Sequence, residues 1–183
     1  MTQPGINVLS HFWAPLCAVG SHGQQGPNAQ ICVSVFGASI VPERPRLLVV
    51  LSNTNYTTGL VAAAGTVTVS VLGERQAAML EPLGLRSGRD SPKLEGLEYA
   101  VSAAGDPYFQ SGAGWAACEV LESFDLGDST AFLAAVREKA DGAERPLSWQ
   151  TAKGLVGAEF LERWAKKSVV EQETARQAMT WRA

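Results

Sequence analysis

The sequence predicts a mainly β domain of the α+β class, a closed or nearly closed barrel with small inserted helices and a C-terminal helix. Three observations favour this fold. The first two thirds of the chain consist of short β-type runs separated by Gly, Pro, Asn and Asp turns. Two short helical patterns interrupt these runs, but helices and strands do not alternate regularly, as they would in a doubly wound parallel sheet. A long amphipathic pattern ends the chain.

Composition narrows the class of protein. The 183 residues are 46% hydrophobic and 18% charged, which suits an ordinary globular core rather than disorder. The formal net charge of −3 argues against charge-driven binding to nucleic acid or to an acidic membrane. No apolar run is long enough to span a bilayer, and the first residues lack the pattern of a secretory signal. We therefore expect a cytoplasmic protein.

Cysteine and histidine usage excludes two further classes of site. Cys17, Cys32 and Cys118 are scattered, odd in number and without a Cys-x-x-Cys pair, so they indicate a reducing compartment and no disulfide framework. The two histidines have no nearby thiolates, so we expect no protein-bound metal.

The first part of the chain predicts three strands. Residues 14–20 form the first, followed by a polar, Gly-rich turn over residues 21–27. Residues 28–37 form the second, and the two prolines of residues 42–45 mark a turn. Residues 47–51 are continuously apolar, which is typical of a strand buried on both faces.

The middle of the chain changes period. Residues 55–65 begin with cap-type residues, continue with helix formers and end at Gly65, which predicts a helix. Residues 66–72 alternate with period two and predict a half-buried strand. Residues 74–83 look helical, and the charged, Gly-rich residues 84–96 are interpreted as a surface loop.

The last part predicts a hairpin and a helix. Residues 115–124 and 131–139 are strands joined by a turn at residues 125–128. Residues 155–179 form an amphipathic helix that lies on its own barrel or on a second subunit. We divide the chain into a barrel domain, residues 1–150, and a helical extension, residues 151–183. The apolar stripe of the helix comprises Phe160, Leu161, Trp164, Ala165, Ser168 and Val169.

A run of polar side chains is the most informative feature of the sequence. It lies between a buried strand and a helix start, where free backbone N–H groups and the positive end of the helix dipole favour a phosphate. Its hydroxyl and amide groups would add hydrogen-bond donors. The alternative is a helix N-cap within a polar loop. The run consists of Ser52, Asn53, Thr54, Asn55, Tyr56, Thr57 and Thr58.

The second predicted strand is the other candidate binding feature. The small residues of positions 28–39 would let a flat aromatic ring lie against the strand backbone. The alternative is a plain core strand. His22, in the Gly-rich turn, either contacts a ligand or is a solvated loop residue.

Together these stretches resemble the flavin-reductase-like family of FMN-binding split barrels, which includes flavoredoxins and the reductase components of two-component monooxygenases. The resemblance covers residues 15–146. It is carried by a strand of the family's Asn-Gly-x-Thr-Ala-Ser-Ser-Phe type, a Pro-rich turn, a Ser/Asn-x-x-Ser-x-Thr helix start, an Asn-Val-Leu-like strand end, a Lys/Arg-Phe-x-Gly-Leu element and a Gly-Asp-His turn. Their counterparts are residues 28–39, 42–45, 52–58, 69–72, 93–97 and 127–129.

The resemblance implies a cofactor and its contacts. FMN is expected, with FAD as a possible substitute and NAD(P)H as a possible electron donor. Lys93 is expected to reach the phosphate or the flavin edge. The resemblance also implies a homodimer, with a partner monooxygenase or another electron acceptor. The ring would lie against Cys32, Val33 and Ser34, while the ribityl chain and phosphate would be held by Ser52, Asn53, Asn55, Thr57 and Thr58.

Two departures from the family pattern bear on activity. Ile31 and Val33 replace a threonine and a serine of the second strand, which leaves only backbone contacts there. Ser129 replaces the histidine associated with the nicotinamide pocket, where His22 is the other candidate. The leading hypothesis is an NAD(P)H-dependent flavin reductase. The alternatives are a non-enzymatic FMN-bound electron carrier and a flavin-free dimeric binding module.

Overall fold

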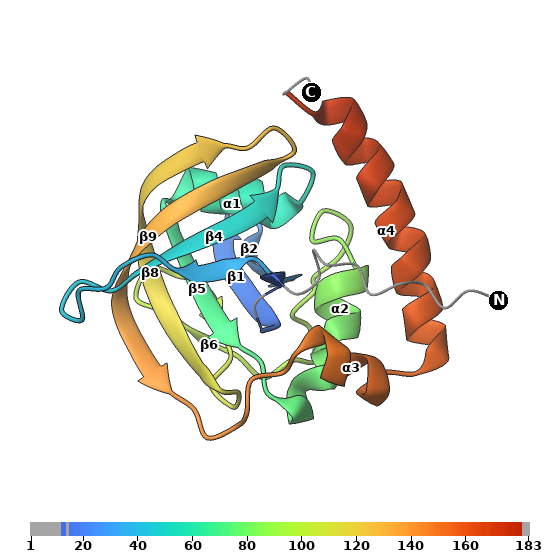
Figure 1. Ribbon diagram of the computed structural model, residues 1–183, viewed down its shortest axis with the longest axis horizontal. Helices are drawn as coiled ribbons and strands as arrows, with labels where there is room; N and C mark the ends of the chain where they lie inside the picture. Colours follow the sequence, from blue (N-terminus) through green and yellow to red (C-terminus); the bar gives the residue numbers. More distant parts are fainter. Residues whose placement is uncertain (1–11, 14, 181–183) are drawn as a thin grey trace.

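The architecture comes from a computed structural model, which describes residues 12–13 and 15–180. Seven strands form one curled antiparallel sheet in the order β2-β1-β5-β8-β9-β4-β3 (Figure 1). They are β1 Cys17–Gly23, β2 Gly26–Cys32, β3 Val35–Gly37, β4 Arg46–Ser52, β5 Thr66–Val71, β8 Gly114–Asp125 and β9 Ser129–Asp141. A separate two-stranded sheet pairs β6 Ala100–Val101 with β7 Pro107–Tyr108. The mainly β prediction is therefore confirmed.

The sheet is closed into a barrel by the chain itself. Strands β2 and β3 stand at opposite ends of the strand order, yet only Val33 and Ser34 separate them. The Val50 N–H of β4 donates to the Ser34 carbonyl at 2.9 Å, and the Cys32 thiol donates to the Val50 carbonyl at 3.5 Å. One extended segment thus leaves the β1 edge and joins the β4 edge. The single strand predicted over residues 28–37 is wrong in detail, because the chain changes partners at this crossing.

Two hydrophobic cores lie on the two sides of β1. Cys17 and Val19 point into the barrel, where Cys32, Cys118 and Phe132 complete the inner core. The alternate residues of β1 point outward and pack under the helices. This alternation explains why β1 is buried on both faces, since neighbouring side chains point to opposite sides of a strand. The outer core includes Leu16, Ala18, Leu72, Leu80, Leu83, Phe109, Leu147 and Phe160.

Strand β5 is more deeply buried than its alternating sequence predicts. Val67 and Val69 face the inner core, but Thr68 and Ser70 are also buried. The segment around β7 covers this outer face: the Phe109 N–H donates to Ser70 Oγ at 2.9 Å, and Thr68 Oγ1 donates to the Pro107 carbonyl. The prediction of a half-buried strand fails because a distant segment supplies the hydrogen-bond partners of these polar residues.

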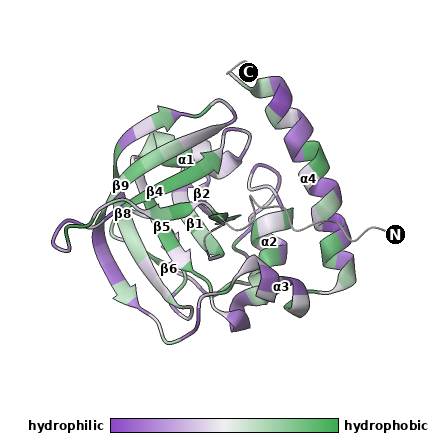
Figure 2. Cartoon of the chain, in the orientation of Figure 1, coloured by the Kyte–Doolittle hydropathy of each residue, from purple (hydrophilic) through white to green (hydrophobic). Residues whose placement is uncertain are grey.

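Strand β4 departs from its prediction in the opposite direction. Val49 and Leu51 are buried, whereas Leu48 and Val50 are half-buried. The outward face of β4 is only partly covered by the rest of the described chain, so the strand is not buried on both faces as predicted. Figure 2 shows the apolar character that β4 shares with neighbouring strands.

The helices include α1 Tyr56–Ala64, a 3₁₀ helix η2 Glu74–Met79, α2 Leu80–Leu85, α3 Trp149–Leu155 and α4 Ala158–Ala178. Helix α1 follows Asn55 and ends at Gly65, whose φ of 69° is in the left-handed region that glycine adopts without strain. This helix and the η2–α2 helical segment confirm two predictions.

The C-terminal helix begins later than predicted, and a short helix, α3, precedes it. Phe160 is buried, and Leu161, Trp164 and Ser168 are half-buried, as the predicted stripe requires. Ala165 and Val169 are exposed, because the inward face continues through Lys167 and Glu171 instead. Residue 150, the proposed domain boundary, falls within α3, so the division into two domains stays a prediction.

Two loops differ from their predictions. Strand β1 runs to Gly23 and β2 starts at Gly26, so the Gly-rich turn is only two residues long; Ala14, the predicted first strand residue, lies outside the described residues. Within residues 84–96, Lys93 and Leu94 are buried rather than on the surface. Leu94 belongs to the outer core, which pulls this part of the loop inward.

We predict that Gly20→Ala destabilises the protein, whereas Gly59→Ala stabilises it slightly. A Cβ at Gly20 would lie 2.1 Å from the Pro107 carbonyl oxygen and 2.5 Å from Thr68 Oγ1, so backbone or buried side chains must move. Overpacking of this kind costs about 1–3 kcal/mol. A Cβ at Gly59 meets nothing within 4 Å, and alanine favours the helix by about 0.5–1 kcal/mol. Urea denaturation of both variants checks the prediction, and equal stabilities would contradict it.

Candidate functional site

The main cavity lies between strand β2, the start of α1, the loop after α2, and helix α4. Its volume is about 350 Å³, within the range of small-molecule sites. Figure 1 shows α4 running past this side of the barrel, with α2 between them at one end. The cavity is lined by Asn28, Gln30, Ile31, Thr54, Asn55, Tyr56, Thr57, Leu83, Gly84, Arg86, Ser87, Gly88, Arg89, Lys93, Trp164, Lys167, Val170, Glu171 and Thr174.

The predicted polar run divides into two sets. Asn55 and Thr57 line the main cavity together with Thr54 and Tyr56. The Asn55 side chain makes no capping hydrogen bond, so it does not occupy the first N–H groups of α1. Tyr56 and Thr57, the first residues of this nine-residue helix, line the cavity, and the first N–H groups of a helix have no partner within it.

The other set is engaged within the protein. Asn53 accepts from Thr130 Oγ1 at 2.6 Å, and its backbone N–H donates to the Asp128 carbonyl at 2.9 Å. Thr58 Oγ1 donates to the Ser52 carbonyl at 2.6 Å. Ser52, Asn53 and Thr58 do not line the main cavity. Their hydrogen bonds fix the shape of the loop, and their predicted flavin contacts stay predictions.

Strand β2, the start of α1 and the loop after α2 are joined by specific contacts. Asn28 Nδ2 donates to Thr57 Oγ1 at 2.7 Å, and Arg89 Nη1 donates to the Thr54 carbonyl at 3.1 Å. The Arg89 guanidinium also lies 5.7 Å from the centre of the Tyr56 ring. A Cβ at Gly88 would lie 2.2 Å from Asn28 Oδ1, so the loop can approach this closely only with glycine there.

Lys93 is the predicted site residue with the most unusual surroundings. Its side chain lines the main cavity and is only 6% exposed. Burial, followed by repulsion from the Lys167 ammonium, lowers the pKa of Lys93 to about 8, while Glu171 acts in the opposite direction. A buried ammonium group is costly unless a negative charge compensates it, so an anion bound in this cavity would stabilise the charged form of Lys93.

The charged groups of the main cavity are mostly positive. Arg86, Arg89, Lys93 and Lys167 line it, and Glu171 is the one carboxylate among the lining residues. Together with the hydroxyl and amide groups, this lining suits an anionic ligand with several polar atoms. Sequence reasoning missed the arginines, although two basic residues in a Gly-rich loop near Lys93 were a usable signal.

A second, smaller cavity adjoins the first across the same loop. Its volume is about 250 Å³. It shares Asn28, Tyr56, Gly88, Arg89 and Lys93 with the main cavity, so the loop is a wall common to both. The remaining lining residues are Gln25, Gly26, Pro27, Asp90, Ser91 and Pro92.

The residues predicted to contact the flavin ring lie elsewhere on the same segment. Cys32 points into the inner core, and burial raises the pKa of its thiol to about 11. Val33 packs against the outer core, and Ser34 occupies the crossing to β4. None of the three lines the main cavity; the lining residues of β2 are Asn28, Gln30 and Ile31. Ring contacts by Cys32, Val33 and Ser34 stay predictions.

The two candidates for a nicotinamide pocket are far apart in the sheet. His22 lies on β1, and its Nδ1 is 2.7 Å from Oδ1 of the buried Asp106. Ser129 begins β9, pairs with Ser52 and donates to Asp128 Oδ1 at 3.1 Å. The structure does not bring His22 and Ser129 together, and neither lines the main cavity.

Two structural features are absent from the described residues. Residues 12–13 and 15–180 contain no cluster of three or more His, Cys, Asp or Glu side chains arranged to hold a metal ion. Within the same residues, no helix combines the length and apolar character needed to cross a membrane.

Comparisons with known proteins agree with this architecture. A family model described as "Flavin reductase like domain" matches residues 9–154. A flavin reductase of Pseudomonas putida is 26% identical over 132 residues, which are 72% of this chain and 75% of that protein.

Solved structures show the same fold. An FMN-binding protein from Thermus thermophilus superposes with a TM-score of 0.66 and 22% identity, covering 77% of this chain and 79% of its own. Nitrilotriacetate monooxygenase component B from Mycobacterium thermoresistibile gives 0.66 and 22%, with coverages of 75% and 74%. The flavin reductase component of a bacterial two-component tryptophan halogenase gives 0.66 and 23%, with coverages of 75% and 86%. The predicted fold is confirmed by these likenesses.

We predict that Lys93→Met removes a specific part of the pH dependence of stability. The unfolded chain keeps the Lys93 proton up to a pH of about 10.5, whereas the folded chain releases it near pH 8. Lys93 should therefore make the free energy of unfolding of the wild type increase with pH between about pH 8 and pH 10.5. Urea denaturation at pH 7, 8.5 and 10 measures it.

The matched control is Lys153→Met, at an exposed lysine of α3. Lys153→Met should keep the wild-type pH dependence. Lys93→Met should stabilise the protein, relative to wild type, most strongly at pH 7. A constant difference between Lys93→Met and wild type across the three pH values would contradict the prediction.

Proposed function

The chain belongs to the family of the flavin reductase like domain, and from this premise we propose that it binds FMN and acts as an NAD(P)H-dependent flavin reductase. One observation carries the proposal. A cavity of about 350 Å³, rich in cations and hydrogen-bond donors, lies where the start of α1 meets strand β2. Such a site offers a phosphate region and a neighbouring surface for a polar ring system.

The phosphate end of FMN fits the side of the cavity near α1. Tyr56 and Thr57 are the first residues of α1. The positive end of the helix dipole lies at their N–H groups and favours a dianion there. Arg86, Arg89 and Lys93 supply cations from the adjoining loop. Arg89 is already held by the Thr54 carbonyl, which places its guanidinium at the same wall.

The rest of the flavin would lie along β2. Asn28 and Gln30 are buried and line the cavity, so their amides can pair with polar ring atoms or ribityl hydroxyls. Ile31 supplies an adjacent apolar surface. When bound, the flavin would supply the redox chemistry, and the protein would bind and orient it. No acid or base of this chain is assigned to electron transfer.

Two finer assignments extend this proposal. NADH or NADPH would be the electron donor, and a partner monooxygenase would be an acceptor. Support comes from the relatives, which include a flavin reductase, the flavin reductase component of a two-component halogenase and a monooxygenase component B. FAD is the alternative flavin, because a structural neighbour from Streptomyces globisporus is described as an NADH:FAD oxidoreductase.

An electron carrier without its own reductase activity is the second candidate. Ser129, in place of a histidine, favours this candidate. Helix α4 also favours it, because α4 lines the cavity and would slow the release of a bound flavin. A flavoredoxin from Methanosarcina acetivorans is among the structural neighbours, with a TM-score of 0.64. A carrier would retain its flavin through gel filtration, whereas a reductase that uses flavin as a substrate would lose it on dilution.

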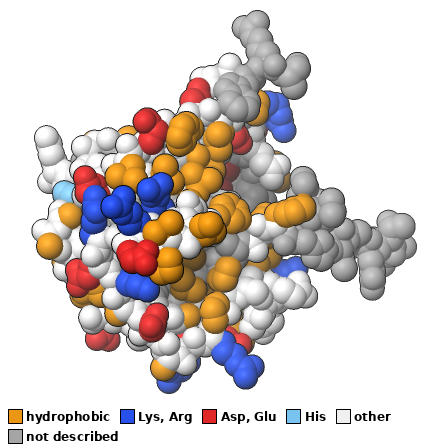
Figure 3. Space-filling view, turned by 60° about the vertical axis from the view of Figure 1, so that its left-hand side comes forward, with side chains coloured by type: hydrophobic (Ala, Val, Ile, Leu, Met, Phe, Trp, Pro, Cys, Tyr) orange, Lys and Arg blue, Asp and Glu red, His pale blue; other side chains and the backbone are white. Residues whose placement is uncertain are grey.

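We also propose a homodimer formed through the outer face of β3, β4 and β9. Phe36 pairs with Leu48, and Leu48 pairs with Leu133, which places three apolar side chains in one outward row. Phe124 extends the face from β8 and is 48% exposed. Figure 3, which brings the β8 and β9 side forward, shows hydrophobic side chains gathered on this face. A second copy would remove this apolar surface from water.

We predict that purified protein with FMN oxidises NADH or NADPH faster than free FMN does. Arg89→Gln should weaken FMN binding about tenfold, because charge-assisted hydrogen bonds contribute about 1.5–3 kcal/mol. Arg137→Gln is the control, since Arg137 pairs with Glu119 on the exposed surface of the barrel. Flavin fluorescence quenching measures affinity. A yellow protein with no acceleration for either nicotinamide would favour the electron carrier, and absence of FMN binding would refute both.

We predict that Phe36→Ser and Leu48→Lys, combined, convert the dimer to a monomer. Both substitutions place polar groups in the proposed interface without touching the main cavity. Val169→Ser is the control, because Val169 is 67% exposed on α4, away from this face. Analytical ultracentrifugation gives the mass in solution. A monomeric wild type would exclude the dimer, and a dimeric double variant would place the interface elsewhere.

A further inference from the structure

Helix α4 lies outside the matched domain yet forms a wall of the main cavity. The family model ends at residue 154, and α4 begins at Ala158. Near its start, Arg163 pairs with Glu81 at 2.7 Å. Beyond its end, Thr180 Oγ1 donates to Asp125 Oδ2 at 2.9 Å, so both ends of the helix are fastened to the barrel domain.

The start of α4 is also fixed by close packing. A Cβ at Gly84 would lie 2.4 Å from the Trp164 ring, so this ring lies directly on the α2 backbone. Trp164 also contacts Trp149, with ring centroids 4.9 Å apart. These contacts set the rotation of α4 about its own axis and therefore determine which residues further along it face the cavity.

The cavity-facing part of α4 carries charged and polar side chains where a packing helix carries mainly apolar ones. Lys167, Glu171 and Thr174 line the main cavity beside Val170, whereas Val169 is 67% exposed to solvent. A helix that only packs on a domain turns mainly apolar side chains inward and its lysines outward. Lys167 instead has a side chain that is only 33% exposed and is paired with Glu171 one turn further along. Such a local conflict with packing rules is expected at a functional site.

Lys167 lines the same cavity as a buried cation, Lys93. Lys93 is 6% exposed, and the Lys167 charge contributes to lowering its pKa, whereas Glu171 opposes that shift. Two ammonium groups that repel each other are both stabilised when an anion lies between them. Arg86 and Arg89 line the same cavity, so the Glu171 carboxylate leaves an excess of positive charge.

We propose that Lys167 of α4, oriented by Glu171, forms with Lys93 a two-lysine clamp for the phosphate dianion of the flavin. The preference for FMN over riboflavin then depends on a helix appended to the flavin reductase like domain. This inference rests on the proposed function, because it names a further residue of the same site. Lys167 is a specificity-determining residue, and Glu171 is a positioning residue.

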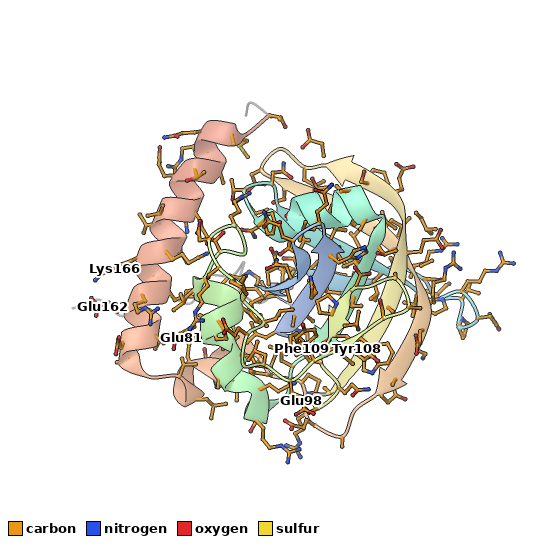
Figure 4. The ribbon with its side chains drawn as sticks, turned by 180° about the vertical axis from the view of Figure 1, so that it is seen from behind. Glu81, Glu98, Tyr108, Phe109, Glu162 and Lys166 are labelled. Atoms are coloured by element: carbon orange, nitrogen blue, oxygen red, sulfur yellow. The ribbon has the colours of Figure 1, made fainter. Side chains whose placement is uncertain are left out.

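Helix α4 contains its own matched control. Lys166 is paired with Glu162 at 2.7 Å, also four residues apart, but their side chains are 74% and 67% exposed. Figure 4 labels Lys166 and Glu162 on the side of α4 that points away from the barrel. Lys166→Gln therefore removes the same charge from the same helix without altering the cavity.

The experiment measures dissociation constants for FMN and for riboflavin by fluorescence quenching, in wild type, Lys167→Gln and Lys166→Gln. Lys167→Gln should weaken FMN binding about tenfold or more and leave riboflavin binding within about twofold, since riboflavin carries no phosphate. Lys166→Gln should match wild type for both. Lys167→Arg should retain most of the FMN preference. Riboflavin binding by each variant confirms that its cavity is folded.

The outcomes separate the two proposals. If wild type binds neither flavin, the proposed function fails and the clamp fails with it. If wild type binds both flavins but Lys167→Gln keeps the wild-type preference for FMN, only the clamp is refuted. An equal loss of FMN and riboflavin binding in Lys167→Gln also refutes it, because that result indicates a structural role.

Discussion

The fold depends on the crossing between β2 and β3, where one extended segment joins the two ends of the sheet. Only Val33 and Ser34 separate β2, which pairs with β1, from β3, which pairs with β4. The sheet must therefore curl until its two ends lie side by side. The inner core follows from this closure, since Cys17, Cys32 and Phe132 then face one another from strands distant in the sequence. The closure also leaves the start of β2 on the outside, where α1, the loop after α2, and α4 gather around it.

Much of the fold could be predicted because its signals are local. Gly65 ends α1 where a left-handed residue is needed, and the turn between β8 and β9 lies where the sequence predicts it. The family resemblance, based on the order of several short motifs, is confirmed by the family model. The burial of Thr68 and Ser70 could not be predicted, because their partners Pro107 and Phe109 are distant in sequence.

The candidate site was predicted in part, and the reason is physical. A run of hydroxyl and amide residues identifies a polar loop before a helix, but not which side chains remain available. Thr58 and Asn53 form hydrogen bonds with Ser52 and Thr130. Thr57 instead lines the cavity, where it accepts a hydrogen bond from Asn28. The contribution of α4 depends on how Trp164 seats on Gly84. A single sequence gives the helix, but not its rotation against the barrel.

The burial of the cysteines has a consequence for the redox chemistry proposed for this protein. Burial raises the pKa of the Cys17 thiol to about 12, that of Cys32 to about 11 and that of Cys118 to about 12. Reduced flavins pass electrons to dioxygen and generate peroxide, which attacks exposed thiolates far faster than buried thiols. The barrel interior therefore shelters its sulfur atoms from the by-products of the chemistry proposed for its outer surface.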